Sequence, residues 1–595
     1  MRLTPSLLIC ILATNVYAQS PQLPLHESVI VSAAAEPVPF ETAGRAVWVL
    51  TRAEIARLPV RSIDELLRYL SSVDVRARGP RVQTDMSIRG AGFGQTLVLV
   101  DGLRINDAQS GHHNSDIPLT LDDVERIEVL LGSGSSLFGA DALGGTINVI
   151  TGDAERGARA TLIGGQHDLA SGRGRVGIAQ GALRQSFAAE GSHSSGFMAA
   201  REFDTVTASS RTAIGPNTRV LFGYARKDFG ANGFYGPAPS HETTDQTLVS
   251  VTHALAVSAW RASLQAMYRT HGDWFLYDPR VANASANRHR TQAATLVARA
   301  SRALGSHGRV NAGTELGGDW IDSNNLGDHT FRRASGFVEM QERLGSRVFL
   351  YPGVRYDRYS RFGDSWSPSM AARVALSGSV SLRASAGHAF RVPTFTELYY
   401  RDPNHQARDT LTPERGWSSE GGVDWIITPS TMARATLFTR HDRDVIDWIR
   451  PSAAVRWQTT NVRRVETTGG ELGLRQLLGK RGWIDLQYTR LTTEATALEG
   501  VLSKYVLEYA PHALVASGSV QAPAGVTLGH RVAWTRRNDG RSDPVVDLRM
   551  SRPVRRLTFV FDAANLFDRR YEEIKGVTMP GRWVSAGVIV SAGSQ

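Results

Sequence analysis

From about residue 155 onward, apolar and polar side chains alternate in short segments, and this alternation constrains the fold more than any other feature of the chain. The segments 381–386, 483–489 and 557–564 each show it. A repeat of two residues is typical of a β-strand whose two faces meet different surroundings. No helical periodicity interrupts the pattern, and about 22 such segments can be counted, as in a large membrane barrel. This part of the chain is therefore expected to be all β.

The connections between these segments fall into two groups of different length. Tight turns are expected at 344–346, 377–378, 428–430, 479–482, 522–525 and 551–553, and long loops near 391–415, 449–460, 493–508 and 567–581. Short turns on one side and long loops on the other are typical of outer-membrane barrels, whereas a soluble β-sandwich does not require them. We therefore expect a transmembrane β-barrel of about 22 antiparallel strands, because a closed sheet leaves no unpaired edge in lipid.

The N-terminus carries the pattern of a secretory signal peptide. Arg2 precedes an apolar run over 7–13, and Val16-Tyr17-Ala18 resembles a cleavage site. The alternative, a short buried helix, lacks an amphipathic continuation. No later stretch reaches the roughly 18 uninterrupted apolar residues of a membrane-spanning helix. We expect residues 1–18 to be removed, and with them Cys10, the only cysteine of the chain.

Residues 38–152 differ from the alternating part and are expected to form a compact α/β unit. Helical spacing over 52–58 and 63–70 and short apolar strands at 97–100 and 127–130 indicate it. A barrel of about 22 strands encloses a lumen that is normally plugged. The sequence thus predicts four parts: a signal peptide (1–18), a linker (19–37), an N-terminal plug domain inside the lumen (38–152) and a barrel (153–595).

The charges and motifs exclude some classes of function. The net charge is +10, but the arginines are scattered among acidic residues, so no nucleic-acid partner is expected. The glycine-rich segment from Gly132 to Ser136 lacks the Gly-Lys-Ser/Thr that a phosphate loop needs. No catalytic triad or carboxylate pair is tied to a recognisable motif. We therefore expect neither an enzyme nor a resident cofactor.

Several motifs follow one another in a fixed order. In the plug they are 87–90 (Ser-Ile-Arg-Gly), 98–102, 124–129 and 132–150, and in the barrel they are 390–399, 411–414, 565–568 and 580–582. With these motifs the chain resembles the TonB-dependent receptor family over nearly all of its mature length. Four ordered motifs in one domain are too many for a chance match.

The resemblance implies an outer-membrane protein that actively imports a scarce nutrient. In this family TonB, together with ExbB and ExbD, displaces the plug after a ligand has bound at the external loops. The implied cargo is a metal chelate, an iron–siderophore or cobalamin, and the implied protein is a monomer in outer-membrane lipid. Alternatives stay open at this point: a passive porin with an open lumen, a structural or adhesin barrel, or a receptor for another scarce nutrient such as a glycan or a nickel chelate.

Seven residues before the plug resemble the TonB box of the family: Glu27, Ser28, Val29, Ile30, Val31, Ser32 and Ala33. Their β-branched centre favours an extended strand, which can add to the sheet edge of a partner protein. We expect flexible flanks, together with Pro37 and Pro39, to keep this segment from joining the plug. On the segment alone, a disordered leader without a partner is an equal alternative.

The family resemblance also implies an ionic contact between plug and barrel. Arg89 matches a plug arginine of the family, and Glu420 and Glu471 match barrel positions that face the lumen; the alternative is that Arg89 is solvated. Desolvation offsets much of the attraction in such a pair, so it would fix orientation more than stability. A second family arginine is missing, because Leu131-Gly132-Ser133 stands where Arg-Gly-Pro is usual. We therefore expect a single ionic pivot between plug and barrel, at Arg89, and a plug that the barrel holds less tightly.

His112, His113 and Asn114 are candidates for ligand contact, because they lie in a plug loop where the family presents residues to its ligand. One imidazole could hydrogen-bond a chelate, or both could be ordinary loop residues. Adjacent residues of an extended stretch point in opposite directions. We therefore expect no metal shared by these two imidazoles.

Aromatic residues of the external loops form a second group of candidates: Phe234, Tyr235, Trp274 and Tyr277. Their rings could stack on a large planar or amphipathic ligand. They could equally belong to the aromatic girdle at the membrane surface. The sequence does not decide between these two roles.

Overall fold

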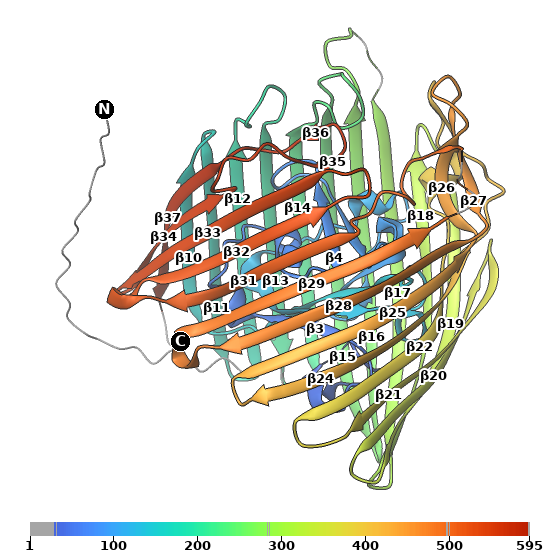
Figure 1. The fold of residues 1–595 in the computed structure, drawn as a ribbon, viewed down its shortest axis with the longest axis vertical. Helices are drawn as coiled ribbons and strands as arrows, with labels where there is room; N and C mark the ends of the chain where they lie inside the picture. Colours follow the sequence, from blue (N-terminus) through green and yellow to red (C-terminus); the bar gives the residue numbers. More distant parts are fainter. Residues whose placement is uncertain are drawn as a thin grey trace.

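The computed structural model describes residues 29–30, 32–282, 284, 286–495, 498 and 500–592. The predicted signal peptide (1–18) lies outside these residues, as do Glu27, Ser28 and Val31 of the predicted TonB box. The described chain forms a closed barrel with a smaller domain inside it (Figure 1).

The barrel has 22 antiparallel strands, which confirms the predicted fold class. Its closing pair joins β10 to β37, in a register that runs from Ala158–Ala592 to Gly165–Ser585. Closure pairs the backbone groups of both end strands, as a sheet in lipid requires. The strands are β10 (Gly157–Gly165), β11 (Leu169–Gln180), β12 (Leu183–Ser194), β13 (Phe203–Ile214), β14 (Thr218–Gly230), β15 (His241–Val257), β16 (Trp260–Leu276), β17 (Asn287–Leu304), β18 (Gly308–Ser323), β19 (His329–Leu344), β20 (Val348–Tyr359), β21 (Gly363–Ala375), β22 (Val380–Arg391), β24 (Glu414–Thr428), β25 (Thr431–Arg443), β28 (Val465–Leu477), β29 (Gly482–Glu494), β31 (His512–Gln521), β32 (Thr527–Arg536), β33 (Ser542–Val554), β34 (Leu557–Ala564) and β37 (Trp583–Ala592).

The two faces of the barrel differ in polarity. In β12, Phe187 is exposed on the outer face, while Ser186 and Glu190 are buried on the inner face. Large apolar side chains such as Leu437 and Leu472 are also exposed on the outside. An apolar outer face and a polar inner face suit lipid outside and a polar lumen inside. Among the described residues, no helix is long and apolar enough to cross a membrane.

The strand connections are short at one end of the barrel and long at the other. The short ones include 345–347, 376–379, 429–430, 478–481 with η6 (Gly479–Arg481) and 522–526 with η8 (Pro523–Gly525). The predicted turn at 551–553 is wrong, because these residues lie inside β33 and the chain turns at Arg555 and Arg556. Arg555 adopts a φ of 56°, a left-handed conformation that lets two residues reverse the chain.

The long connections carry structure of their own. Four of their strands pair in the order β23-β27-β26-β30, so three separate connections meet in one sheet near the rim of the barrel (Figure 1). The elements are α4 (Phe395–Tyr399), β23 (His405–Gln406), β26 (Val445–Arg450), β27 (Trp457–Val462), β30 (Leu502–Ser503), β35 (Glu572–Ile574) and β36 (Val577–Thr578).

The plug contains a five-stranded sheet in the order β3-β8-β9-β6-β7 and two smaller pairs, β4-β5 and β1-β2. Both predicted helices, over 52–58 and 63–70, are shorter in the structure. The second one changes into a 3-10 turn after a single α-helical turn. The elements are β1 (Val29–Ile30), β2 (Val38–Pro39), η1 (Phe40–Thr42), β3 (Val47–Thr51), α1 (Arg52–Ile55), α2 (Ile63–Leu66), η2 (Leu67–Tyr69), β4 (Val73–Ala77), β5 (Thr84–Ile88), η3 (Phe93–Gln95), β6 (Thr96–Val100), β7 (Leu103–Arg104), η4 (Gly111–His113), η5 (Leu121–Asp123), β8 (Val124–Leu131), α3 (Ser135–Phe138) and β9 (Gly145–Thr151).

An apolar core holds the plug together. Leu66 from α2, Val98 from β6, Ile127 from β8 and Ile147 from β9 are fully buried in one cluster. Full burial of a side chain of this kind contributes about 1.5–3 kcal/mol. The same cluster includes barrel side chains such as Leu221, Met267 and Trp483, so apolar packing also joins the plug to the barrel wall.

The plug lies inside the barrel, where Figure 1 shows its blue strands enclosed by the barrel wall. Its hydrogen bonds reach strands on different sides: Ser209 of β13 donates to Asp123 over 2.7 Å, and Tyr351 of β20 donates to the carbonyl of Thr42 over 2.8 Å. The passive-porin alternative needs an open lumen with residues 38–152 folded elsewhere. This arrangement contradicts it.

Candidate functional site

Arg89 forms the central contact between plug and barrel. It follows β5 with a φ of 51°, and Gly90 continues the turn with a φ of 69°. Its Nε and Nη2 donate to the two carboxylate oxygens of Glu471, and its Nη1 donates to Glu420, each over 2.7 Å. A planar guanidinium suits such a bidentate contact. The structure thus brings Arg89, Glu420 and Glu471 together.

This contact is withdrawn from water. The side chain of Arg89 is 3% exposed, and the ring of Phe438 lies 4.3 Å from its guanidinium carbon. Burial alone would lower the pKa of Arg89, but the charges of Glu471 and Glu420 outweigh burial and raise it above its ordinary value. Arg89 therefore stays charged, and removal of one partner would leave an uncompensated buried charge.

Although the second family arginine is missing, the plug has more than one ionic contact with the barrel. Leu131 packs into the apolar core of the plug, while the backbone N–H of Ala46 donates to Glu420 over 3.0 Å. Further ion pairs join plug and barrel: Arg45–Glu339, Glu54–Arg475, Arg68–Glu573, Asp74–Arg537, Arg76–Glu508, Arg81–Glu190, Asp107–Arg269, Asp116–Lys227, Asp122–Arg173 and Asp123–Arg211. The expectation of one pivot is wrong, because charged side chains from many plug segments share this role. The looser plug inferred from it loses its basis.

The described part of the predicted TonB box is attached to the plug. β1 pairs with β2, so that Val29 lies opposite Pro39 and Ile30 opposite Val38. The expectation that Pro37 and Pro39 keep this segment apart is wrong. Pro39 ends a two-residue edge strand, a position that tolerates its missing N–H.

Burial and polar contacts both hold the box in place. Ile30 is fully buried against an apolar cluster that includes Phe40 and Leu130. The backbone N–H of Ser32 donates to Glu128 over 2.7 Å, and the carbonyl of Ala33 accepts from Arg45 over 2.9 Å. The described part of the segment is therefore held by residues near the start of the plug and by Glu128 and Leu130 of β8.

The two adjacent histidines point to different partners. Nδ1 of His112 lies 2.6 Å from Oδ1 of Asp85, and its ring stacks on Phe93 with centroids 4.3 Å apart. Nε2 of His113 lies 3.4 Å from Oδ2 of Asp273 on β16. Burial lowers the pKa of His112 more than Asp85 raises it. His112 thus belongs to an aromatic contact rather than to the acidic surroundings of His113.

His113 and Asn114 are buried, so an external ligand reaches neither of them directly. Burial alone would lower the pKa of His113, but hydrogen bonds to Asp116 and Asp273 outweigh burial and raise it well above its ordinary value. Oδ1 of Asn114 accepts from the backbone N–H of Asp107 over 3.0 Å. These two residues hold the loop, and His112 alone of the three predicted residues is partly exposed.

The four predicted aromatic residues do not form one site. Phe234 is buried beneath Arg201, at 4.3 Å, whereas Tyr277 is exposed. Trp274 packs beside His241, with centroids 6.3 Å apart, on the face of β16 opposite to the buried Asp273. Trp274 therefore faces outward, in agreement with the girdle alternative.

Tyr235 contacts polar and charged residues of the plug. Its hydroxyl donates to Gln83 over 2.7 Å, and its ring lies 5.5 Å from the guanidinium carbon of Arg78. Phe275 packs edge-on against the same ring, with centroids 5.1 Å apart. Tyr235 thus joins an external loop to the plug.

Comparison with known proteins identifies both parts of this assembly. Residues 40–146 match the TonB-dependent receptor plug domain, and residues 189–557 match the TonB-dependent receptor-like β-barrel. The chain belongs to the TonB-dependent receptor family. Its plug and barrel are thus the two standard parts of such a receptor, in the order that the sequence resemblance implied.

Relatives of this TonB-dependent receptor include transporters and receptors of known ligands. The vitamin B12 transporter BtuB of Photobacterium profundum is 27% identical over 488 residues, which cover 75% of each chain. BtuB of Vibrio vulnificus (strain YJ016) is 24% identical and covers 77% of this chain and 76% of its own. Two solved structures share the fold. The siderophore receptor PirA from Acinetobacter baumannii has a TM-score of 0.77 and 16% sequence identity, and the match covers 92% of this chain and 98% of PirA. A mutant of the ferric enterobactin receptor PfeA from Pseudomonas aeruginosa has a TM-score of 0.76 and 19% identity, and the match covers 93% of this chain and 98% of PfeA.

The receptor also carries a loop cluster that sequence reasoning missed. Nζ of Lys504 lies 2.9 Å from Nε2 of His405 and 6.0, 5.8 and 5.8 Å from the ring centroids of Trp448, Trp457 and Tyr505. Burial lowers the pKa of Lys504 to about 8. Three separate loops contribute these residues, so no local motif could have revealed them. We call this set the loop platform.

The loop platform is continuous with the plug. The ring of Tyr505 packs edge-on against Phe93, with centroids 5.0 Å apart, and lies 6.0 Å from His112. External loops and a plug apex therefore share one aromatic and cationic surface. A ligand bound at this surface would touch both the loops and the plug.

Proposed function

We propose that this receptor is an outer-membrane transporter that imports a metal chelate, an iron–siderophore or cobalamin, by TonB-driven displacement of the plug. TonB would act together with ExbB and ExbD through the box at 27–33. The observation that carries the proposal is the enclosed plug, which meets the barrel through ion pairs spread over many of its segments. A lumen closed in this way passes a large solute only when the plug shifts.

The attachment of the box suits a pull from the periplasm. Among the described residues, β1 and β2 share two residue pairs, Ser32 contacts Glu128 and Asn148, and the carbonyl of Ala33 accepts from Arg45. Peeling these contacts apart releases an extended strand that a partner's sheet edge can capture. The inner-membrane potential supplies about 2.3 kcal/mol per charge per 100 mV, so a few charges can do the work.

The ligand class follows from the loop platform together with the relatives. Indole and phenol rings around a buried ammonium group suit a ligand with flat faces and acceptor oxygens. Curated relatives are vitamin B12 transporters and solved structures of the same fold are siderophore receptors, which supports both chelate classes. A receptor for a glycan or a nickel chelate remains an outcome of the binding test.

Deletion of residues 27–33 tests the energised step. We expect uptake to be lost and ligand binding to be kept, since the loop platform lies far along the chain from the box. Deletion of the seven residues 19–25 provides a matched control, in which uptake should persist. Unchanged uptake without the box would reject TonB-driven transport.

Binding to the purified receptor distinguishes the ligand classes. Ferric enterobactin, a ferric hydroxamate and cyanocobalamin are titrated in detergent against the wild type and Trp457→Ala, which changes a partly exposed ring of the loop platform. We expect one class to bind, with about tenfold weaker binding to the variant, because one aromatic contact contributes about 0.5–1.5 kcal/mol. Trp366→Ala, which changes an exposed tryptophan on the barrel exterior, is the control. Equal binding by both variants would place the ligand elsewhere.

A further inference from the structure

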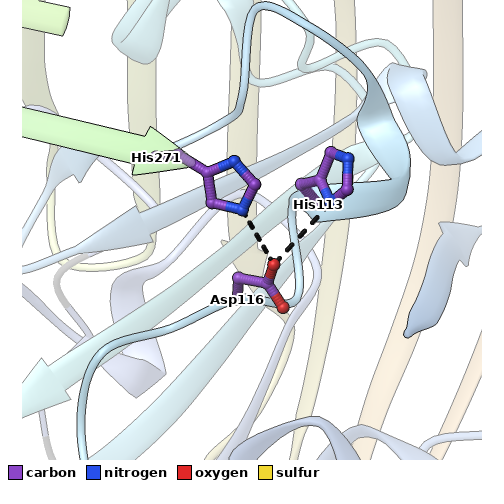
Figure 2. Close-up of side chains that lie close together, drawn as sticks. All are labelled: His113, Asp116 and His271. Atoms are coloured by element: carbon purple, nitrogen blue, oxygen red, sulfur yellow. Dashed lines mark hydrogen bonds and ion pairs between the residues drawn. The ribbon is translucent and has the colours of Figure 1, made fainter. Parts of the chain in front are cut away.

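Beside the histidine loop, plug and barrel bring together a cluster that the proposed transport does not use. His113 and Asp116 belong to the plug, and His271 belongs to β16; Figure 2 shows both imidazoles directed at the Asp116 carboxylate. The three residues are 5%, 6% and 0% exposed. Nε2 of His271 lies 3.0 Å from Oδ2 of Asp116, and Nδ1 of His113 lies 3.7 Å from the same oxygen.

These separations suit one tetrahedral metal ion. Zn²⁺ binds histidine nitrogens and carboxylate oxygens at about 2.0–2.2 Å, so neighbouring ligand atoms lie about 3.3 Å apart. The observed values of 3.0 and 3.7 Å bracket that distance. All three ligand atoms lie within 4.8 Å of one another. Three protein ligands would leave a fourth coordination position open.

The surroundings of the cluster carry more negative than positive charge. The buried carboxylates are Asp107, Asp116, Glu242 and Asp273, and the basic side chains paired with them are Arg269 and Lys227. Arg78, another basic side chain of the plug nearby, is paired with Asp85 over 3.2 Å. Histidine nitrogens bind a metal ion only when they are unprotonated, so a divalent cation would take the place of a proton among these carboxylates.

Groups next to the three ligand atoms are placed to hold them in position. Oδ1 of Asp273 and Nδ1 of His271 are buried without a hydrogen-bond partner among the described residues. Nδ1 of His271 lies 3.5 Å from Oδ2 of Asp107, close enough to donate after a small shift. Oδ1 of Asp116 accepts from Lys227 over 2.7 Å, which leaves Oδ2 for the imidazoles. Metal-bound histidines and carboxylates are usually held by partners of this kind.

We propose that His113, Asp116 and His271 bind a divalent first-row transition metal, with Zn²⁺ the best fit, in a site shared by plug and barrel. Two imidazoles and one carboxylate suit Zn²⁺, whereas Ca²⁺ and Mg²⁺ prefer oxygen ligands. The metal ties the plug loop that carries His113 and Asp116 to the barrel wall. His112 is not a ligand in this site. The expectation that the adjacent His112 and His113 do not share a metal is therefore kept, and the second imidazole comes from His271 of the barrel.

Metal binding by the purified full-length receptor tests the proposal. After removal of metals with a chelator, the protein is dialysed against ZnCl₂ and its metal content is measured. We expect one Zn²⁺ per wild-type chain and binding at least about 100-fold weaker in His271→Gln and Asp116→Asn, since even loss of an outer partner weakens metal binding 10–100-fold. His388→Gln, on β22 with its ring against Trp417, is the matched control and should bind like the wild type.

The outcomes separate a metal site from an ion-paired cluster. No bound Zn²⁺, equal binding by all variants, or binding of CaCl₂ in preference to ZnCl₂ overturns the proposal. Circular dichroism checks the fold of each variant. Where His271→Gln fails to fold, anomalous scattering at the zinc edge from wild-type crystals decides: a peak between the three side chains supports the site, and a peak elsewhere or none overturns it. These readouts do not depend on transport, so the site and the proposed function fail separately.

Discussion

The inside of the plug and the seam between plug and barrel differ in their side chains: the inside is apolar, whereas the seam combines ion pairs with apolar contacts to barrel residues such as Leu221 and Trp483. Inside the plug, Leu66, Ile127 and Ile147 exclude water. Along the seam, Arg89, Glu420 and the other ion pairs face one another. Separating an apolar core exposes its surface to water at a high free-energy cost, whereas separated charges regain hydration. The difference indicates a plug that keeps its own fold when it moves and a seam that fixes orientation.

Packing differs between the two regions as well. The seam contains a cavity of about 130 Å³, whose lining includes Arg373, Arg383, Arg434, Arg475 and Asp424. The lining also contains apolar side chains such as Trp48 and Leu131, so charged and apolar groups of plug and barrel meet around this space. Incomplete packing of this kind reduces the contact that must be lost when plug and barrel part.

The largest effect is expected from Arg89→Ala. Because Glu471 would lose its guanidinium partner and Glu420 would keep only Arg383 as an ionic partner, the free energy of opening of β5 should fall by about 3–5 kcal/mol. Native-state hydrogen exchange of the β5 amides measures it. Arg184→Ala, which changes an exposed arginine, should leave β5 unchanged. Unaltered exchange in Arg89→Ala would mean that the seam does not hold the plug in place.

The second-largest effect is expected from a change in the apolar core of the plug. Leu66→Ala leaves a cavity in the plug core and should lower the stability of the plug by about 2–5 kcal/mol. Hydrogen exchange should then accelerate together in β8 and β9, while the barrel strand β20 is unaffected. Leu472→Ala on the outer barrel face is the control. Acceleration confined to α2 would contradict a plug that behaves as one unit.

A smaller effect is expected at the start of α1. The hydroxyl of Thr51 accepts from the N–H of Glu54, whose carboxylate accepts from the N–H of Thr51. Thr51→Ala removes half of this capping box and should cost about 1 kcal/mol, seen as faster exchange in α1 alone. Thr51→Ser keeps the hydroxyl and should resemble the wild type. A change spread over the whole plug would show that α1 belongs to the cooperative core.

The smallest effect is expected when the whole central ion pair is replaced. In Arg89→Met combined with Glu420→Gln and Glu471→Gln, no unpaired charge of this group remains, so the opening free energy of β5 should return to within about 1 kcal/mol of the wild type. The same exchange experiment compares it with Arg89→Ala. A triple variant as unstable as the single one would show that the ion pairs bind the plug instead of orienting it.

Several features of the site depend on residues that are distant in sequence. Arg89 and Glu471 are 382 positions apart, and only the family resemblance suggested their contact. His271 lies 155 positions from Asp116 and carries no motif, so the cluster around Asp116 could not be predicted. The loop platform escaped for the same reason, because three connections supply it.

The sequence by itself determined the barrel, its closure and the two lengths of its connections. Alternation within a strand and the residues of a tight turn are local properties, so a single chain displays them directly. The tertiary structure alone decided which charges meet across the seam, that the box pairs with β2 against the expected effect of Pro37 and Pro39, and that two histidines share one carboxylate. Those contacts depend on how a separate domain sits within a closed wall, and no local pattern of residues encodes that position.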